Sequence, residues 1–172
     1  MAMRLFIAVN LDTKMKQLVR HVQNSFRRQN VRGNYTPDEN LHLTLTFIGE
    51  YGDPDMVLEA MESVSFSPFE ITLDKVGCFD TLWWAGIDNS EELEKIAARL
   101  RRALAEAGIP FDRKKFSPHV TFLRKAEHVD KAVFSHLNVR PVSMKVDRIS
   151  LMQSTRGKTG MIYTELGAVT AQ

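Results

Sequence analysis

The fold of this chain is decided by residues 40–50, which read Asn40-Leu41-His42-Leu43-Thr44-Leu45-Thr46-Phe47-Ile48-Gly49-Glu50. Residues 41–48 alternate with a period of two, the spacing at which successive side chains of a β-strand point to opposite faces. We therefore expect a strand with Leu41, Leu43, Leu45 and Phe47 on one face and His42, Thr44, Thr46 and Ile48 on the other. The second face presents an imidazole beside hydroxyl groups, which a strand that only covers a core does not need.

A second His-x-Thr triplet, His119-Val120-Thr121, lies in another stretch that predicts a strand, over residues 119–123. With five histidines and eleven threonines, such a chain contains about 0.3 of these triplets by chance, so one match alone means little. Two matches are much rarer. We therefore predict that the triplets form one site donated by two facing strands, with His42 and His119 as its central pair.

The two triplets also occupy matching places in an internal repeat, with an offset of 77 residues between positions 42 and 119. The predicted helix caps Asp12 and Asn89 are separated by the same offset. A strand–helix–loop–strand order used twice predicts two similar α+β lobes around a shared cleft. We expect a single two-lobed domain over residues 1–172, with pseudo-repeats over approximately 3–80 and 81–166.

The remaining patterns are those of ordinary helices, strands and loops. They predict strands over residues 5–11, 69–73, 82–87, 142–152 and 161–166, helices after Asp12, Pro54 and Asn89, a short helical segment over 129–137 and a loop over 30–40.

Composition narrows the class of protein. Hydrophobic residues make up 44% and charged residues 26% of 172 positions, as in soluble globular proteins. The net charge of +2 is too small to indicate nucleic-acid binding by itself. No apolar stretch approaches the length of a membrane span, so we expect no membrane partner. The single cysteine, Cys78, excludes an internal disulfide and favours the cytoplasm, and its apolar neighbours predict that it is buried.

The pair of triplets suits the opening of a cyclic phosphate. Water attacks phosphorus in line with the departing ribose oxygen, so one group must accept a proton and another must donate one. Two imidazoles can do both near neutral pH. The hydroxyl groups of Thr44 and Thr121 can donate hydrogen bonds to the non-bridging oxygens. This scheme needs no metal or other cofactor, and we expect none, because the sequence lacks a His-Glu-x-x-His motif, clustered cysteines and an Asp-rich loop.

Residues 40–50 resemble the first signature of the two-histidine phosphoesterases, in the branch of RNA 2′,3′-cyclic phosphodiesterases or 2′-5′ RNA ligase-like proteins. The second signature is matched by Phe116-Ser117-Pro118-His119-Val120-Thr121-Phe122-Leu123-Arg124. Further likeness lies in Met3-Arg4-Leu5-Phe6-Ile7-Ala8-Val9, Leu82-Trp83-Trp84-Ala85-Gly86 and Gly160-Met161-Ile162-Tyr163. The resemblance therefore spans nearly the whole chain.

The resemblance implies a bilobal α+β fold with pseudo-twofold symmetry, in which two antiparallel sheets face a central cleft and helices pack on the outside. It also implies metal-independent hydrolysis of an RNA-terminal 2′,3′-cyclic phosphate to a 2′-phosphomonoester. In that reaction His42 would be the proton donor and His119 the proton acceptor. A basic residue is also found in the family at the position of Arg124, which implies a phosphate contact. Strand parity places Arg124 on the face opposite His119 unless the strand ends or bulges there.

Other interpretations of the same residues stay open. The substrates of such a site could be small cyclic-phosphate nucleotides or 2′-5′ linked oligonucleotides, with weak 2′-5′ RNA ligase activity as the reverse reaction. A non-catalytic RNA-binding module is a third possibility. We expect RNA ends or small nucleotides as partners, and a monomer. A base could stack on one of five aromatic side chains, Trp83, Trp84, Phe79, Phe116 or Tyr163.

Overall fold

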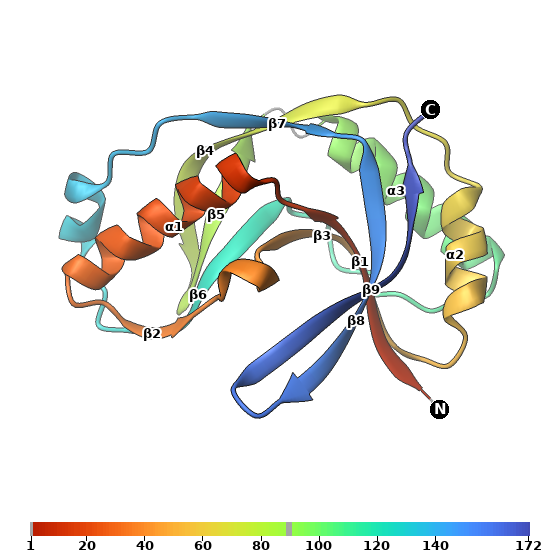
Figure 1. Cartoon of the computed structure of the whole chain (residues 1–172), viewed down its shortest axis with the longest axis horizontal. Helices are drawn as coiled ribbons and strands as arrows, with labels where there is room; N and C mark the ends of the chain where they lie inside the picture. Colours follow the sequence, from red (N-terminus) through yellow and green to blue (C-terminus); the bar gives the residue numbers. More distant parts are fainter. Residues whose placement is uncertain (1, 89–90) are drawn as a thin grey trace.

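The computed structural model describes residues 2–88 and 91–172, so the predicted cap Asn89 lies outside the described residues. Figure 1 shows helices placed around antiparallel strands. In chain order the elements are β1 (Met3–Asn10), α1 (Thr13–Arg28), β2 (Arg32–Tyr35), a 3₁₀ helix (Asp38–Asn40), β3 (His42–Tyr51), α2 (Pro54–Glu62), β4 (Phe69–Phe79), β5 (Leu82–Asp88), α3 (Glu91–Glu106), β6 (His119–Glu127), a second 3₁₀ helix (Lys131–His136), β7 (Val142–Val146), β8 (Arg148–Gly157) and β9 (Gly160–Thr170).

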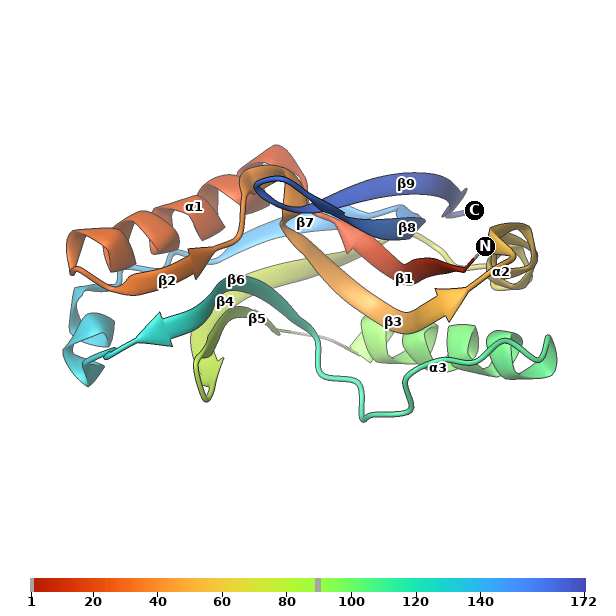
Figure 2. The ribbon, with the colours of Figure 1, turned by 90° about the horizontal axis from the view of Figure 1, so that it is seen from below.

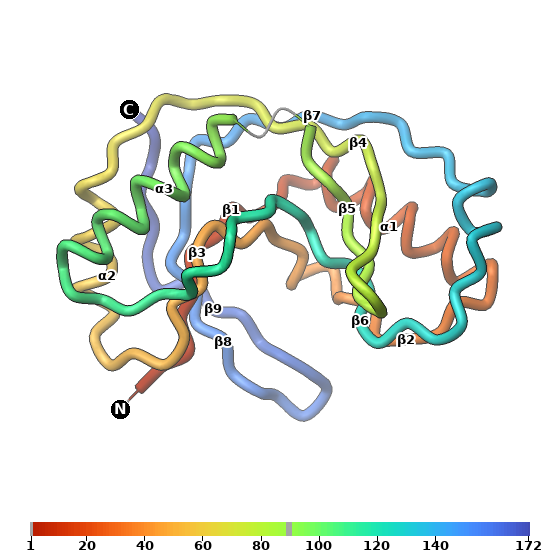
Figure 3. The backbone as a smooth tube through the Cα atoms, turned by 180° about the vertical axis from the view of Figure 1, so that it is seen from behind, coloured from red at the N-terminus to blue at the C-terminus, as the bar shows by residue number. Residues whose placement is uncertain are grey.

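The described strands form two antiparallel sheets, one in the order β3-β1-β8-β9 and the other in the order β2-β6-β5-β4-β7. Each sheet takes strands from both halves of the chain, because β8 and β9 join β1 and β3, whereas β2 and β4 join β5 and β6. Figure 3 shows the two groups of strands beside each other, and β3 and β6 are the strands at which the sheets approach.

Each of the two long helices packs against the sheet that does not contain the strand before it. The side chain of Asp12 caps α1, as predicted, by accepting a hydrogen bond from the Met15 amide at 2.9 Å. The buried stripe of α1, which includes Leu18, Val22 and Phe26, faces the second sheet, where α1 contacts β6 and β7. Conversely, α3 follows β5 of the second sheet but contacts β3 of the first. Figure 2 shows these two helices at opposite ends of the molecule.

This arrangement confirms the predicted α+β fold of two antiparallel sheets with helices on the outside. The pseudo-repeats stay a prediction. If the chain has them, each repeat contributes strands to both sheets and packs its long helix against the sheet that does not contain its first strand. A single large cluster of buried apolar side chains joins both sheets and the three α-helices of the described chain. None of the described helices combines the length and the apolar character that a membrane span requires.

Two local predictions are wrong. Residues 30–40 are not all loop, because β2 pairs with β6 within this stretch. As a short strand at the edge of its sheet, β2 exposes Arg32, Gly33 and Asn34, so its sequence shows no apolar alternation. Cys78 is exposed rather than buried, since it lies beside the turn of the β4–β5 hairpin, where little of the core covers it.

Candidate active site

The first triplet lies on β3 with His42 and Thr44 on one face. They pair with Asn10 and Ala8 of β1, and both are half-buried, whereas Leu43 between them points into the core. The His42 Nε2 atom lies 2.9 Å from the Thr44 Oγ1 atom, within hydrogen-bond distance. The structure therefore presents the imidazole and the hydroxyl group together, as the alternation predicts.

The second triplet lies on β6 in the same way. His119 and Thr121 are half-buried and pair with Gly86 and Trp84 of β5, whereas Val120 is fully buried. Since β3 and β6 are the strands at which the sheets approach, the two triplets, far apart in sequence, lie near each other. The His119 side chain acts electrostatically on His42, as the pKa of His42 shows below.

A β-bulge follows the triplet on β3. Thr44 and Thr46 pair with successive residues of β1, which leaves Leu45 as the extra residue and changes the faces that follow. Phe47 therefore turns toward the side of His42, while Ile48 points into the core and Thr46 is almost fully buried. The predicted faces of these last three residues are wrong for that reason.

The same irregularity recurs on β6. Thr121 and Leu123 pair with successive residues of β5, so Phe122 is the extra residue, at the offset of 77 from Leu45. The bulge turns Arg124 to the side of the histidines, and its side chain lines the cavity beside His42. Strand parity placed Arg124 on the face opposite His119 unless the strand bulged, and this bulge brings Arg124 to the site.

Three of the predicted site residues, His42, Thr44 and Arg124, line one cavity of about 500 Å³. Its other lining residues are Arg4, Phe6, Phe47, Ser154, Arg156, Met161 and Tyr163. His119 lines a neighbouring hollow of about 200 Å³ with Lys75, Trp84, Ile87, Ser117 and Pro118. Thr121 belongs to neither lining within the described chain. Among residues 2–88 and 91–172, no group of three or more His, Cys, Asp or Glu side chains is placed to hold a metal ion.

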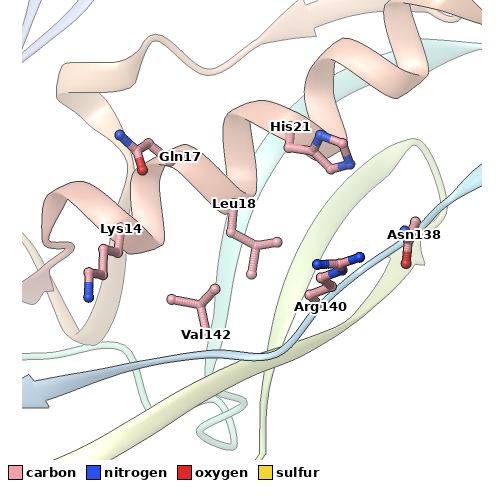
Figure 4. A pocket seen from close by; sticks show the side chains of 7 residues that line it. All are labelled: Lys14, Gln17, Leu18, His21, Asn138, Arg140 and Val142. Atoms are coloured by element: carbon pink, nitrogen blue, oxygen red, sulfur yellow. The ribbon is translucent and has the colours of Figure 1, made fainter.

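A further hollow of about 590 Å³ lies between α1 and the segment that leads into β7. Figure 4 shows its side chains, which include Lys14, His21 and Arg140 but none of the predicted site residues. His21 is exposed there, away from the histidine pair.

The two histidines are oriented by backbone groups that the sequence analysis missed. The Nδ1 atom of His42 lies 2.7 Å from the Asn40 carbonyl oxygen, and that of His119 lies 2.6 Å from the Ser117 carbonyl oxygen. A carbonyl oxygen can only accept, so each Nδ1 carries a proton and donates it. The Nε2 atoms are thus left for the site, where that of His42 meets the Thr44 hydroxyl group. Asn40 and Ser117 are also 77 residues apart, so the predicted repeat is the sequence signal that could have revealed them.

Asn40 is itself held in place. Its side chain is buried, and its Nδ2 atom donates to the Met161 carbonyl oxygen of β9 at 2.9 Å. The His42 ring packs against the rings of Phe6 and Tyr163, with centroid distances of 4.9 and 5.1 Å, and these two rings also contact each other at 5.1 Å. These contacts leave His42 little rotational freedom, which favours a defined direction for proton transfer.

The aromatic residues considered for base stacking are separated by the structure. Tyr163 contacts His42, and the exposed ring of Phe79 lies 5.6 Å from that of His119. Trp84 packs beside Phe79, whereas Trp83 is buried in the core. Tyr163 and Phe79 therefore flank the two histidines on different strands.

The pKa of His42 is lowered, first by burial and further by its electrostatic interactions with Arg124 and with the nearby His119 side chain. The hydrogen bond to the Asn40 carbonyl opposes this change, because it favours the protonated ring. The free protein therefore favours neutral His42, and a nearby anion would favour its protonated form. Such a site, with two polarised imidazoles, hydroxyl groups and an arginine, can bind a phosphate and move protons on two sides of it.

Comparison with known proteins defines the class to which this fold and site belong. The family model of the 2′-5′ RNA ligase superfamily matches residues 10–158, and the chain belongs to this superfamily. The predicted membership in the two-histidine phosphoesterases is thereby confirmed.

Particular relatives cover nearly the whole chain. An RNA 2′,3′-cyclic phosphodiesterase of Thermotoga maritima is 30% identical, over 95% of this chain and 93% of that protein. An RNA 2′,3′-cyclic phosphodiesterase of Archaeoglobus fulgidus is 31% identical, over 95% of this chain and 98% of that protein. Among solved structures, Escherichia coli LigT in its apo form has a TM-score of 0.83 and 25% identity, covering 99% of each chain. A Thermus thermophilus protein has a TM-score of 0.78 and 28% identity, covering 98% and 97%.

Proposed function

We propose that the chain hydrolyses RNA-terminal 2′,3′-cyclic phosphate to a 2′-phosphomonoester without a metal ion. The observation that carries the proposal is the pair of histidines on approaching strands, with both Nδ1 atoms bound to backbone carbonyl groups. This leaves the Nε2 atoms for the reaction, that of His42 beside the hydroxyl group of Thr44. The activity that names the relatives, RNA 2′,3′-cyclic phosphodiesterase, supports the same reaction.

In the proposed mechanism the cyclic phosphate lies between His42 and His119. His119 Nε2 accepts a proton from water as the water oxygen bonds to phosphorus, and the bond from phosphorus to the 3′ oxygen breaks. His42 Nε2 donates a proton to that oxygen, which leaves a 3′ hydroxyl and a 2′-phosphate. Thr44 and Thr121 donate hydrogen bonds to the non-bridging oxygens, and Arg124 pairs with their charge.

The charge of the substrate reconciles this role of His42 with its lowered pKa. In the free protein, burial and the neighbouring positive charge of Arg124 disfavour the protonated ring. A bound cyclic phosphate is an anion, so it offsets the charge of Arg124 and raises the pKa of His42. His42 therefore gains its proton when there is a substrate to receive it.

The test uses an oligonucleotide that ends in a 2′,3′-cyclic phosphate, with EDTA present, and follows the products by phosphorus NMR. We expect a 2′-phosphate, and a loss of about 10²–10⁴-fold in kcat for His42→Ala and for His119→Ala. His21→Ala, at the exposed histidine of Figure 4, serves as the matched control and keeps its activity. A 3′-phosphate product would reverse the assignment of the leaving oxygen. Turnover that survives both active-site substitutions would refute the mechanism.

We also propose that the protein acts as a monomer in the cytoplasm. Both His-Thr units come from one chain, so the proposed site needs no group from a second copy. The exposed thiol of Cys78 suits a reducing compartment, where it stays unoxidised. Light scattering coupled to size-exclusion chromatography tests the monomer, and fractionation of the source cells tests the location.

A further inference from the structure

The cavity beside His42 contains more positive charge than one cyclic phosphate can use. Arg124, Arg4 and Arg156 all line it, and its lining includes no Asp or Glu. A cyclic phosphodiester carries a single negative charge, which the proposed mechanism already places beside Arg124. Within residues 2–88 and 91–172, neither Arg4 nor Arg156 forms an ion pair, so both guanidinium groups are available to a ligand.

Arg4 lies outward along β1 from the residues that pair with the first triplet. It is four residues from Ala8, which pairs with Thr44, and four residues of strand span about 13 Å. The guanidinium carbon is held 4.8 Å from the ring centroid of Phe47 by a cation–π contact. Phe47 pairs with Phe6, one row of side chains outward from Thr44. The positive charge of Arg4 is therefore displaced outward from the proton-transfer groups.

Arg156 continues in the same direction. On β8, Met152 pairs with Phe6 and Ser154 pairs with Arg4, so Arg156 lies two residues farther out on the same face. This part of β8 belongs to the β8–β9 hairpin, which projects away from the helices in Figure 1. The two arginines thus follow one another along a line that leads out from His42.

We propose that Arg4 and Arg156 form a subsite for the backbone phosphates of the RNA strand that precedes the cyclic end. The inference rests on the proposed function, because the cyclic end must lie at His42 for the strand to pass these arginines. Phosphate contacts of this kind position a strand without selecting its sequence. The enzyme then has a lower KM for an oligonucleotide than for a cyclic mononucleotide, because the mononucleotide has no second phosphate to bind these arginines.

The kinetic test compares a single-stranded oligonucleotide that ends in a 2′,3′-cyclic phosphate with a 2′,3′-cyclic mononucleotide. Arg4→Ala and Arg156→Ala should each raise KM for the oligonucleotide roughly threefold to tenfold more than KM for the mononucleotide. Arg4→Lys should restore much of the difference, because it keeps the charge. The matched control is Arg140→Ala, in the other basic hollow (Figure 4), which should leave both values unchanged.

A binding measurement keeps the test independent of turnover. Its probe is a fluorescein-labelled oligonucleotide that ends in a 2′-phosphate, and its readout is the slope of log Kd against log salt concentration. Each arginine removed should reduce that slope by about 0.7, the value for one single-strand phosphate contact. Equal changes for both substrates with an unaltered slope would overturn the subsite, and so would a larger loss with Arg140→Ala. Wild-type protein that binds with the expected slope but turns over neither substrate would refute the proposed function alone.

Discussion

The hydrogen bond from Asn40 to Met161 offers a sharp test of how the site is held. The side-chain amide of Asn40 joins the 3₁₀ helix before β3 to β9. The backbone carbonyl group of Asn40 orients His42. Asn40→Ala removes the donor and leaves the Met161 carbonyl group without it. Asn40→Asp keeps the shape but places a carboxylate oxygen against that carbonyl oxygen.

The expected magnitude follows from burial. Asn40 is 7% exposed, and its bond to Met161 is 2.9 Å long, so water does not readily replace it. Leaving such an acceptor unsatisfied costs about 1–3 kcal/mol, and we expect about 2 kcal/mol of lost stability for Asn40→Ala. Asn40→Asp should lose at least as much. Because the His42 ring shifts when its carbonyl partner moves, kcat should fall by up to about 10²-fold, with little change in KM.

Urea denaturation measures the first effect, and steady-state kinetics on a cyclic-phosphate oligonucleotide measures the second. Asn138→Ala is the matched control, because that asparagine lies in the hollow of Figure 4, away from the histidine pair, and it should change stability by no more than about 0.5 kcal/mol. Wild-type stability in Asn40→Ala would refute the role of the bond. Lost stability with an unchanged kcat would refute the positioning of His42.

Three further outcomes are expected. Thr44→Val and Thr121→Val each keep side-chain volume but remove a donor to the phosphoryl oxygens, so kcat/KM should fall about 10–100-fold, and a fall below threefold in both would contradict the assigned roles. Arg124→Gln removes a positive charge that lowers the pKa of His42, so the pKa of His42 should rise. The alkaline limb of the plot of kcat/KM against pH should then move to higher pH. Movement of the acidic limb instead would make His42 the proton acceptor. Gln23→Leu removes a buried amide that donates to two backbone carbonyl groups at 2.9 and 3.0 Å, and chemical denaturation should show a loss of about 1–3 kcal/mol, whereas wild-type stability would exclude this bracing role.

Period-two alternation predicts a strand well where one face is buried and the other is not. The strands β3 and β6 were predicted for this reason, with His42 and His119 on the correct face. The edge strand β2 was missed because neither face is buried, so its polar sequence resembles a loop. Exposure of Cys78 was missed for a related reason, since local apolar sequence does not reveal the end of a hairpin.

The bulges limited what could be predicted of the site. Alternation assumes regular pairing, and one extra residue in a strand reverses every face after it. Phe47 was therefore assigned to the wrong face, and Arg124 could be assigned only conditionally. Arg4 and Arg156 carried no signal at all, because they enter the cavity through the pairing of β1 with β8, which brings together the two ends of the chain.

The sharing of strands between the two sheets has a consequence for how the protein comes apart. The hydrogen-bonded neighbours of β1 include β8, and those of β6 include β2, so neither half of the chain can keep its sheet after the other half is lost. Unfolding should then be cooperative across the whole molecule, with one transition for both sheets. A partly melted form that keeps one histidine in place and loses the other has no stable scaffold, so catalytic competence and structural integrity should vanish together on heating.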